Sequence, residues 1–400
     1  MDTNTIIEKN VKINKKYGLD TVENQKCLPI MYWTPKMHKS PIGARFIIAS
    51  KKCSTKPLTE AVSKTFKMIF AHVNSFHRKS RFYSGYNRFW VVENSFPIIE
   101  KLNLINKNSK ATAISTFDFS TLYTTLPHAL LIEVLNSIID FVFDSGTRNR
   151  IGFSKNSVYW TNKGKNNRYF SKNSLKDAIE HLISNCYFTV GNLIFNQIIG
   201  IPMGIDPAPF WANLFLYYFE NIHMQSLISS GSNRAYLYHA TKRFIDDLIA
   251  INDKNEFLST YTNIYPPELQ LKLEHHGSHA TFLDLDINIV DGKFVYKLFD
   301  KRDAFPFSIV RMPQLESNIP SNIFYGSIMS EFLRIARCTL KFEDFIPRAS
   351  ELYHRMLNQG GKESNILKQI KNAYNRHKTA FKNFQVNYTD IISAIINYEL

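Results

Sequence analysis

Two adjacent aspartates inside an apolar segment constrain the fold of this chain more than any other sequence feature. Asp246 and Asp247 interrupt residues 243–251 (RFIDDLIAI), most of which are apolar or β-branched. This pattern indicates two short buried strands that meet at a tight turn. Because a buried carboxylate is costly unless it is paired, protonated or bound to a cation, such a turn could present both acids to one or two Mg²⁺ ions. A solvated turn without a ligand is the alternative.

A third acid lies in a similar setting far upstream. Asp118 is the only charged residue in residues 114–123 (ISTFDFSTLY), which also has the pattern of a strand. The chain between Asp118 and Asp246 is long enough for a helical excursion that returns the next strands beside the first. Three carboxylates on adjacent strands could hold two cations roughly 3.5–4 Å apart, as in phosphoryl transfer. The alternative is a strand-end aspartate that caps the next helix.

Several segments, in their order along the chain, resemble known motifs. Three segments resemble motifs A, B and C of reverse transcriptases, respectively: residues 117–123 (FDFSTLY), 200–209 (GIPMGIDPAP) and 244–247 (FIDD). Four segments resemble sequences of Penelope-like retroelements: residues 34–39 (TPKMHK), 43–47 (GARFI), 120–128 (STLYTTLPH) and 281–286 (TFLDLD). The resemblance extends from residue 28 to residue 385. It implies an RNA-directed DNA polymerase of a retrotransposon, which adds deoxynucleotides to a primer 3′-hydroxyl by two-metal phosphoryl transfer.

The resemblance also implies the architecture of the chain. It predicts an α+β right-hand polymerase with fingers, palm and thumb, in which an antiparallel palm sheet carries the acidic site. The expected division is a polar N-terminal arm (1–27), fingers (28–110), palm (111–290, with a fingers-like helical excursion at 129–185) and a helical, basic thumb with a C-terminal tail (291–400).

Local patterns predict the elements between the motifs. Apolar periodicity predicts helices over 58–73, 129–143 and 207–225, and mostly helical structure beyond residue 300. Gly191 and Asn192 predict a hairpin turn. Residues 145–172, rich in Asn, Lys, Ser and Gly, predict an exposed loop, followed by a helix that Ser174 caps.

The resemblance assigns metal-binding roles to the three acids. It implies that Asp118 and Asp246 are ligands, and that Asp247 is a weaker ligand or a primer-side partner. The backbone carbonyl of Phe119 is a further expected ligand. The expected cofactor is Mg²⁺, as two ions, with Mn²⁺ as a substitute. Asp118, Asp246 and Asp247 are therefore the expected catalytic residues.

A second group of residues is expected to bind the incoming nucleotide. The resemblance implies that Lys36 and Arg45, with Lys39 in reserve, grip the triphosphate, which suits the point charge of Lys and the fork of Arg. Solvated surface cations are the alternative. It also implies that Tyr123 stacks beneath the sugar and excludes a 2′-hydroxyl; without the resemblance Tyr123 would be an ordinary core residue.

The segment that resembles motif B departs from the family. Gly200 and Gly204 bracket a strand-to-helix turn, where glycine permits close backbone approach to a nucleotide or template base. Met203 stands where the family often has Gln, and Ile205 where it often has Ser. Gln197, just upstream, is expected to contact nucleic acid.

Charge indicates a polyanionic partner. The net charge is +15, and basic residues of the C-terminal region, Arg334 and Arg337 among them, are expected to contact phosphates. The expected partners are an RNA template, a DNA primer and deoxynucleotide triphosphates, with protein partners unknown. Cations alternate with aromatics in residues 77–90, which suggests single-strand binding or, alternatively, a packed segment with snorkelling cations.

Other features limit the possible functions. Asp284 and Asp286 lie in an expected hairpin that would grip the primer end or merely face solvent. His275, His276 and His279 are expected in an exposed loop rather than a metal site. The four scattered cysteines argue against a disulfide framework, and no apolar segment suggests a signal peptide or membrane span, so an intracellular protein without membrane contact is expected.

One expected part of the family is not seen. Penelope-like elements commonly carry a GIY-YIG endonuclease after the polymerase, and residues beyond 300 show no such paired segments. The chain is therefore expected to be a fragment, a truncated copy or an endonuclease-lacking type. A non-catalytic or domesticated nucleic-acid-binding relic of such an element is the alternative function.

Overall fold

The computed structural model describes residues 2–37, 41–163, 168–201, 203–307, 309 and 312–399, so Lys39 lies outside the described residues. The chain forms two compact units. One contains Met1–Val91 and Phe117–Lys272, and the other contains Val92–Thr116 and Leu273–Leu400. Two of the three boundaries fall within strands, β3 (Ile114–Phe119) and β11 (Leu271–Gly277), and the third lies between Val91 and Val92.

The first unit is built around long helices, as the apolar periodicity predicts. The expected helix over 58–73 is confirmed and extends further, ending at Gly85 in the left-handed conformation (φ 75°). It packs against the expected helix that begins near residue 207, where Phe66 meets Trp211 edge to face at 6.1 Å. The helices of this unit are α1 (Thr3–Lys16), α2 (Lys56–Ser84), α4 (Leu122–Thr125), α5 (His128–Asp144), α6 (Lys172–Ser184), α7 (Ala208–Ser229) and α8 (Glu256–Thr260).

The polar arm expected at residues 1–27 contains a helix, α1, which buries Ile6. Two local expectations for this unit need correction. Where residues 145–163 and 168–172 were expected to form a loop, they contain a small sheet of β4 (Arg150–Phe153), β5 (Val158–Thr161) and β6 (Tyr169–Ser171). Its apolar runs are too short for periodicity to reveal. Ser171, not Ser174, caps α6, and its side chain accepts from the Ser174 backbone N–H.

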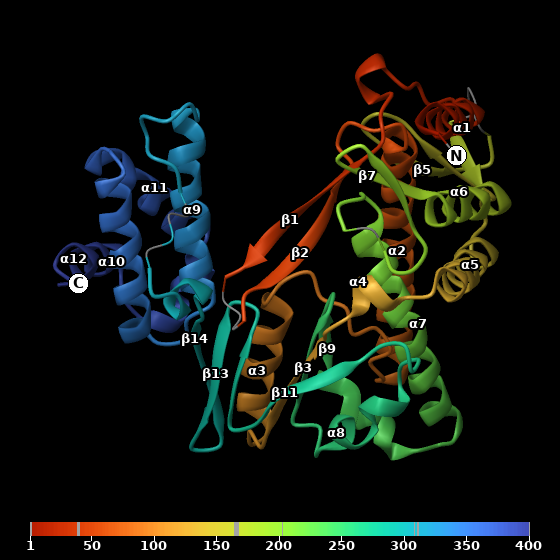
Figure 1. The fold of residues 1–400 in the computed structure, drawn as a ribbon. Helices are drawn as coiled ribbons and strands as arrows, with labels where there is room; N and C mark the ends of the chain where they lie inside the picture. Colours follow the sequence, from red (N-terminus) through yellow and green to blue (C-terminus); the bar gives the residue numbers. More distant parts are fainter. Residues whose placement is uncertain are drawn as a thin grey trace. The chain divides into compact units, whose positions relative to one another are not determined.

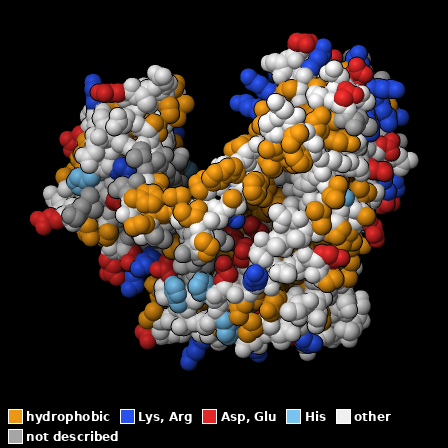
Figure 2. Space-filling view, viewed as in Figure 1, with side chains coloured by type: hydrophobic (Ala, Val, Ile, Leu, Met, Phe, Trp, Pro, Cys, Tyr) orange, Lys and Arg blue, Asp and Glu red, His pale blue; other side chains and the backbone are white. Residues whose placement is uncertain are grey.

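A second sheet has the order β2-β1-β7-β8, formed by β1 (Ile30–Lys36), β2 (Gly43–Ala49), β7 (Cys186–Val190) and β8 (Leu193–Gln197). The hairpin turn expected at Gly191 is confirmed, with φ 57°. Hydrophobic side chains lie exposed along β1 and β2 (Figure 2), among them Trp33 and Phe46, which face each other across the strands.

The third sheet carries the acids. Its order is β11-β3-β10-β9, with β9 (Lys242–Phe244) antiparallel to β10 (Asp247–Ile251). The two short strands and tight turn predicted from residues 243–251 are thereby confirmed. Figure 1 labels β3, β9 and β11 of this sheet close together, with α8 below them.

The second unit combines a small sheet with helices. A helix, α3 (Phe96–Asn108), is joined to the sheet by hydrogen bonds between Asn106 and the backbone of Phe294. The predicted helical character beyond residue 300 is confirmed (Figure 1). The sheet consists of β12 (His279–Phe282), β13 (Leu285–Val290) and β14 (Lys293–Leu298), and the later helices are α9 (Ser321–Arg337), α10 (Phe342–Asn358), α11 (Glu363–Arg376) and α12 (Tyr388–Ile396). Within the described parts of both units, no helix has the length and apolar character needed to cross a membrane.

Candidate active site

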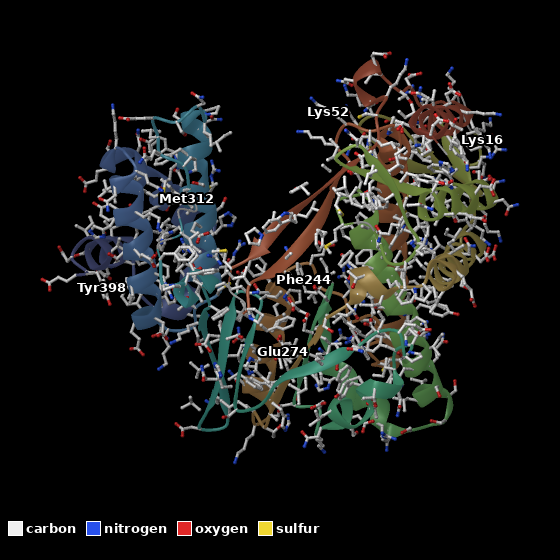
Figure 3. The ribbon with its side chains drawn as sticks, viewed as in Figure 1. Lys16, Lys52, Phe244, Glu274, Met312 and Tyr398 are labelled. Carbon is white, nitrogen blue, oxygen red and sulfur yellow. The ribbon has the colours of Figure 1, made fainter. Side chains whose placement is uncertain are left out.

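Asp246 occupies a strained two-residue turn. Phe244, labelled in Figure 3, ends β9 and pairs with Asp247 at the start of β10, so Ile245 and Asp246 form the turn between them. Ile245 has φ 54°, a conformation that is unfavourable for a β-branched residue. Such strain persists only where surrounding contacts impose it.

Asp118 lies on the neighbouring strand, as predicted. The backbone N–H of Phe119 donates to the carbonyl oxygen of Asp246 over 3.2 Å, which joins the end of β3 to the turn. Both aspartate side chains are half-buried. The pairing of β3 with β10 thus brings together acids that are far apart in the sequence.

The pKa of the Asp246 carboxyl reflects its burial and the charges around it. Burial raises the pKa of the Asp246 carboxyl above its usual range, and the charge of Asp118 raises it further. Arg45 and Arg243 act in the opposite direction. Arg45, which was expected from the sequence to bind nucleotide, therefore lies within electrostatic reach of the acids.

The donor set suits a hard divalent cation that arrives with other ligands. Two carboxylates that repel each other in a partly desolvated place are relieved by a positive ion. Within the described ranges, no cluster of three or more His, Cys, Asp and Glu side chains is placed to hold a metal by itself. Mg²⁺ is commonly bound by one or two carboxylates together with water and substrate phosphates. Asp118 and Asp246 fit this mode.

A buried ion pair that sequence reasoning missed supports the turn. Arg243 and Glu220 are both fully buried and paired with each other. Arg243 also donates to the carbonyl oxygen of Ile245 over 2.8 Å and to the Asn213 side chain over 2.9 Å. The hydroxyl of Tyr265 donates to Glu220 over 3.0 Å. The available signal was Glu220, which is the only Asp, Glu, Lys or Arg in the otherwise mostly apolar α7.

The buried group of Arg243, Glu220 and Tyr265 also contacts the strand that carries Asp118. The ring of Tyr265 meets the ring of Phe119 edge to face, with centroids 4.8 Å apart. Phe119 follows Asp118 directly in β3. One buried cluster therefore contacts both backbone segments that carry the site acids.

The β1–β2 register places two expected nucleotide-binding cations on one face. Lys36 pairs with Gly43 and Arg45 pairs with Thr34, so alternation puts both side chains on the same side of the hairpin. Arg45 is exposed and Lys36 is half-buried. Triphosphate binding by the pair stays a prediction.

Tyr123 combines features of both interpretations. Burial, with a contribution from the charge of Asp246, raises the pKa of its hydroxyl to about 12. The side chain is partly buried and packs against the hydrophobic core of the first unit. It is thus a packed residue beside the acidic turn, and sugar selection stays a prediction.

The two glycines of the motif B segment are required by the chain itself. A Cβ on Gly200 (φ +81°) would lie 2.3 Å from the carbonyl oxygen of Tyr123, and a Cβ on Gly204 (φ +116°) would lie 2.2 Å from that of Ile48. The close approach that the sequence indicates is therefore made by β2 and by the segment after β3. An approach to nucleotide at Gly204 stays a prediction.

Neighbouring residues of this segment are also held by the chain. Asp206 accepts from Lys56 over 2.7 Å and from the Thr59 hydroxyl over 2.8 Å, which attaches the turn to α2. Gln197, expected to contact nucleic acid, is half-buried and donates to the carbonyl oxygen of Ile199 over 2.9 Å. Contact between Gln197 and nucleic acid stays a prediction.

Arg334 and Arg337, which were expected from the sequence to contact phosphates, have partners within the second unit that the sequence did not indicate. Arg334 donates to Asp284 over 2.9 Å and to Glu331 over 2.6 Å, so acids already compensate its charge. Arg337 lies over the ring of Phe96, 4.9 Å from its centroid. Phosphate binding by these two side chains would have to compete with those contacts.

Two remaining expectations are resolved in part. His275, His276 and His279 are exposed, as expected, but they lie on β11 and β12 rather than in a loop. Asp286 accepts from His279 over 2.8 Å.

In residues 77–90 the packed interpretation holds for His77, which lies 2.6 Å from the Tyr217 hydroxyl, and for buried Trp90, which stacks on Tyr238. Phe82 and Tyr83, between these two residues in the sequence, are exposed.

Comparison with known proteins supports the fold. A telomerase from Candida albicans, solved with a fragment of telomeric RNA, aligns with a TM-score of 0.62 and 11% identity over 92% of this chain and 62% of that chain. The chain has a polymerase-like fold. No protein-family model and no curated protein matches it.

Other solved structures align less well. A telomerase from Candida tropicalis aligns with a TM-score of 0.49 and 14% identity, over 98% of this chain and 68% of that chain. The RNA-dependent RNA polymerase of BmCPV aligns with a TM-score of 0.48 and 12% identity, over 88% of this chain and 30% of that chain.

Proposed function

We propose that this chain is an RNA-directed DNA polymerase of a Penelope-like retrotransposon. The observation that carries the proposal is the pairing of β3 with β10, which brings Asp118 beside the strained turn of Asp246. The Penelope-like assignment rests on the sequence segments quoted above. The polymerase-like fold agrees with both.

The residues present would share the work as follows. Asp118 and Asp246 would hold a divalent cation together with substrate phosphates, and such an ion supplies charge neutralisation at the transferred phosphoryl group. Asp247, at the start of β10, stands next to them as a further ligand or a primer-side contact. Arg45 would bind the triphosphate, where its fork suits phosphate oxygens. The buried Arg243–Glu220 pair would keep the turn rigid.

Primer extension tests the proposal. The chain should extend a DNA primer annealed to an RNA template when deoxynucleotides and Mg²⁺ are present. Asp246→Asn should abolish extension because it removes a charged ligand with almost no change of shape. Asp140→Asn, which neutralises a half-buried acid on α5 that pairs with Lys176, is the matched control and should extend normally. Undiminished extension by the Asp246→Asn protein would refute the assignment of the site.

A non-catalytic nucleic-acid-binding relic is the second candidate. It is favoured by Met203 and Ile205, which depart from the family pattern in motif B. This candidate predicts binding of an RNA–DNA hybrid without nucleotide incorporation under Mg²⁺ or Mn²⁺. Incorporation by the unaltered chain would exclude it.

A further inference from the structure

The small sheet of the first unit has an unusual charge. Residues 145–172 contain seven Lys and Arg and no Asp or Glu, so the positive charge of the chain is concentrated there. Two of these cations, Arg168 and Lys172, already face acids on neighbouring segments. Lys155, in the turn between β4 and β5, and Lys163, just after β5, are exposed.

The two faces of this sheet differ. One face is buried through Ile151, Phe153 and Phe170, and Trp160 meets Phe143 edge to face at 5.2 Å. On the other face, Gly152 of the central strand pairs with Tyr159 on one side and Tyr169 on the other. Alternation along β4 places Arg150 on that same outer face.

The outer face presents aromatic rings beside a cation. A Cβ on Gly152 would lie 2.8 Å from Cε2 of Tyr159, so this ring lies across the glycine. Tyr159 is nevertheless 45% exposed. The guanidinium of Arg150 lies over the ring of Tyr169, 4.5 Å from its centroid. Flat exposed rings next to cations are the chemistry that binds unpaired bases and their phosphates.

We propose that the outer face of the β5-β4-β6 sheet binds single-stranded nucleic acid. Tyr159 stacks on a base, Arg150 and Tyr169 form a second stacking position, and Lys155 and Lys163 contact phosphates at the two ends of β5. Single strands are favoured over duplexes because only unpaired bases offer their faces for stacking. This binding site goes beyond the proposed polymerase function and does not depend on it.

Binding of fluorescent single strands tests the stacking. Short single-stranded RNA, single-stranded DNA and a blunt RNA duplex are titrated with the full chain, and photo-crosslinks from 4-thiouridine RNA are mapped to peptides. We expect crosslinks at Tyr159 or Tyr169. Tyr159→Leu, which still covers Gly152, should weaken single-strand binding roughly fivefold or more and leave duplex binding unchanged, whereas Tyr159→Phe should bind like the unaltered chain. Comparing RNA with DNA shows whether the 2′-hydroxyl contributes.

A pair of lysine variants tests the phosphate contacts without altering the core. The double variant Lys155→Gln with Lys163→Gln should reduce the slope of log affinity against log salt by about 1.4, because each phosphate contact on a single strand contributes about 0.7 to this slope. Lys12→Gln with Lys15→Gln, two exposed lysines on α1, is the control of equal charge and should leave the slope unchanged. Equal behaviour of the two lysine pairs, or crosslinks only outside residues 145–172, would overturn the proposal. A chain that binds single strands here but never extends a primer would refute only the polymerase function.

Discussion

Removing one partner of the buried Arg243–Glu220 pair is expected to be strongly destabilising. Both side chains are fully buried, and Arg243 also holds the carbonyl of Ile245 in the turn before Asp246. Arg243→Met leaves the Glu220 carboxylate without its partner, which costs about 3–5 kcal/mol of unfolding free energy. For a unit of this size that corresponds to a fall in Tm of roughly 6–20 °C.

A double variant separates stability from catalysis. Arg243→Met with Glu220→Leu replaces the ion pair by apolar side chains, and such replacements are often neutral or stabilising. We expect the double variant to regain most of the lost Tm. Its primer extension should still fall at least about tenfold, which corresponds to about 1.4 kcal/mol in the barrier, because the donor to the strained Ile245 carbonyl is missing.

Thermal unfolding and single-turnover primer extension are measured on the same preparations. Lys26→Met, which breaks a solvent-exposed pair with Glu23, is the control and should cost no more than about 1 kcal/mol. If Arg243→Met changes Tm no more than this control, the pair does not carry a buried charge. If the double variant is stable and extends primers normally, the network does not position the acids.

Three further predictions follow from the site. Burial raises the pKa of Asp246, so protonation should begin to weaken Mn²⁺ binding, measured by calorimetry, at a higher pH than it would for an ordinary aspartate. Asp246→Asn should raise Tm at neutral pH in the absence of divalent ions, because it removes an unfavourable buried charge. An unaltered Tm would contradict the burial of that charge. Tyr123→Ala should reduce discrimination against ribonucleotides and also lose about 3–5 kcal/mol of stability as a cavity forms, whereas unchanged discrimination in a folded variant would remove Tyr123 from the site. Gly204→Ala should lower Tm more than Gly191→Ala, because both have positive φ but only the former meets a carbonyl oxygen, that of Ile48; equal losses by denaturant titration would show that the contact is relaxed.

Much of the local structure was determined by the sequence alone. The spacing of the apolar residues Val62, Phe66 and Ile69 specified α2, because residues at this spacing lie on one face of a helix, and that face is buried in the structure. The two acids in an otherwise apolar run specified the β9–β10 turn, because a carboxylate inside a buried strand is costly unless a partner compensates its charge. These are properties of a few neighbouring residues, and they do not require the rest of the molecule.

The tertiary structure decided which distant residues meet. That Asp118 adjoins Asp246 depends on the pairing of β3 with β10, and that Arg45 acts on the same carboxyl depends on where the β1–β2 hairpin lies. The sheet at residues 145–172 has strands of three or four residues, which are stable only when packed against helices, so the sequence resembled a loop. The sequence did not reveal the partner of Arg243 either. A buried charge is tolerated only beside an opposite charge, and the fold places Glu220 of another element, α7, next to Arg243.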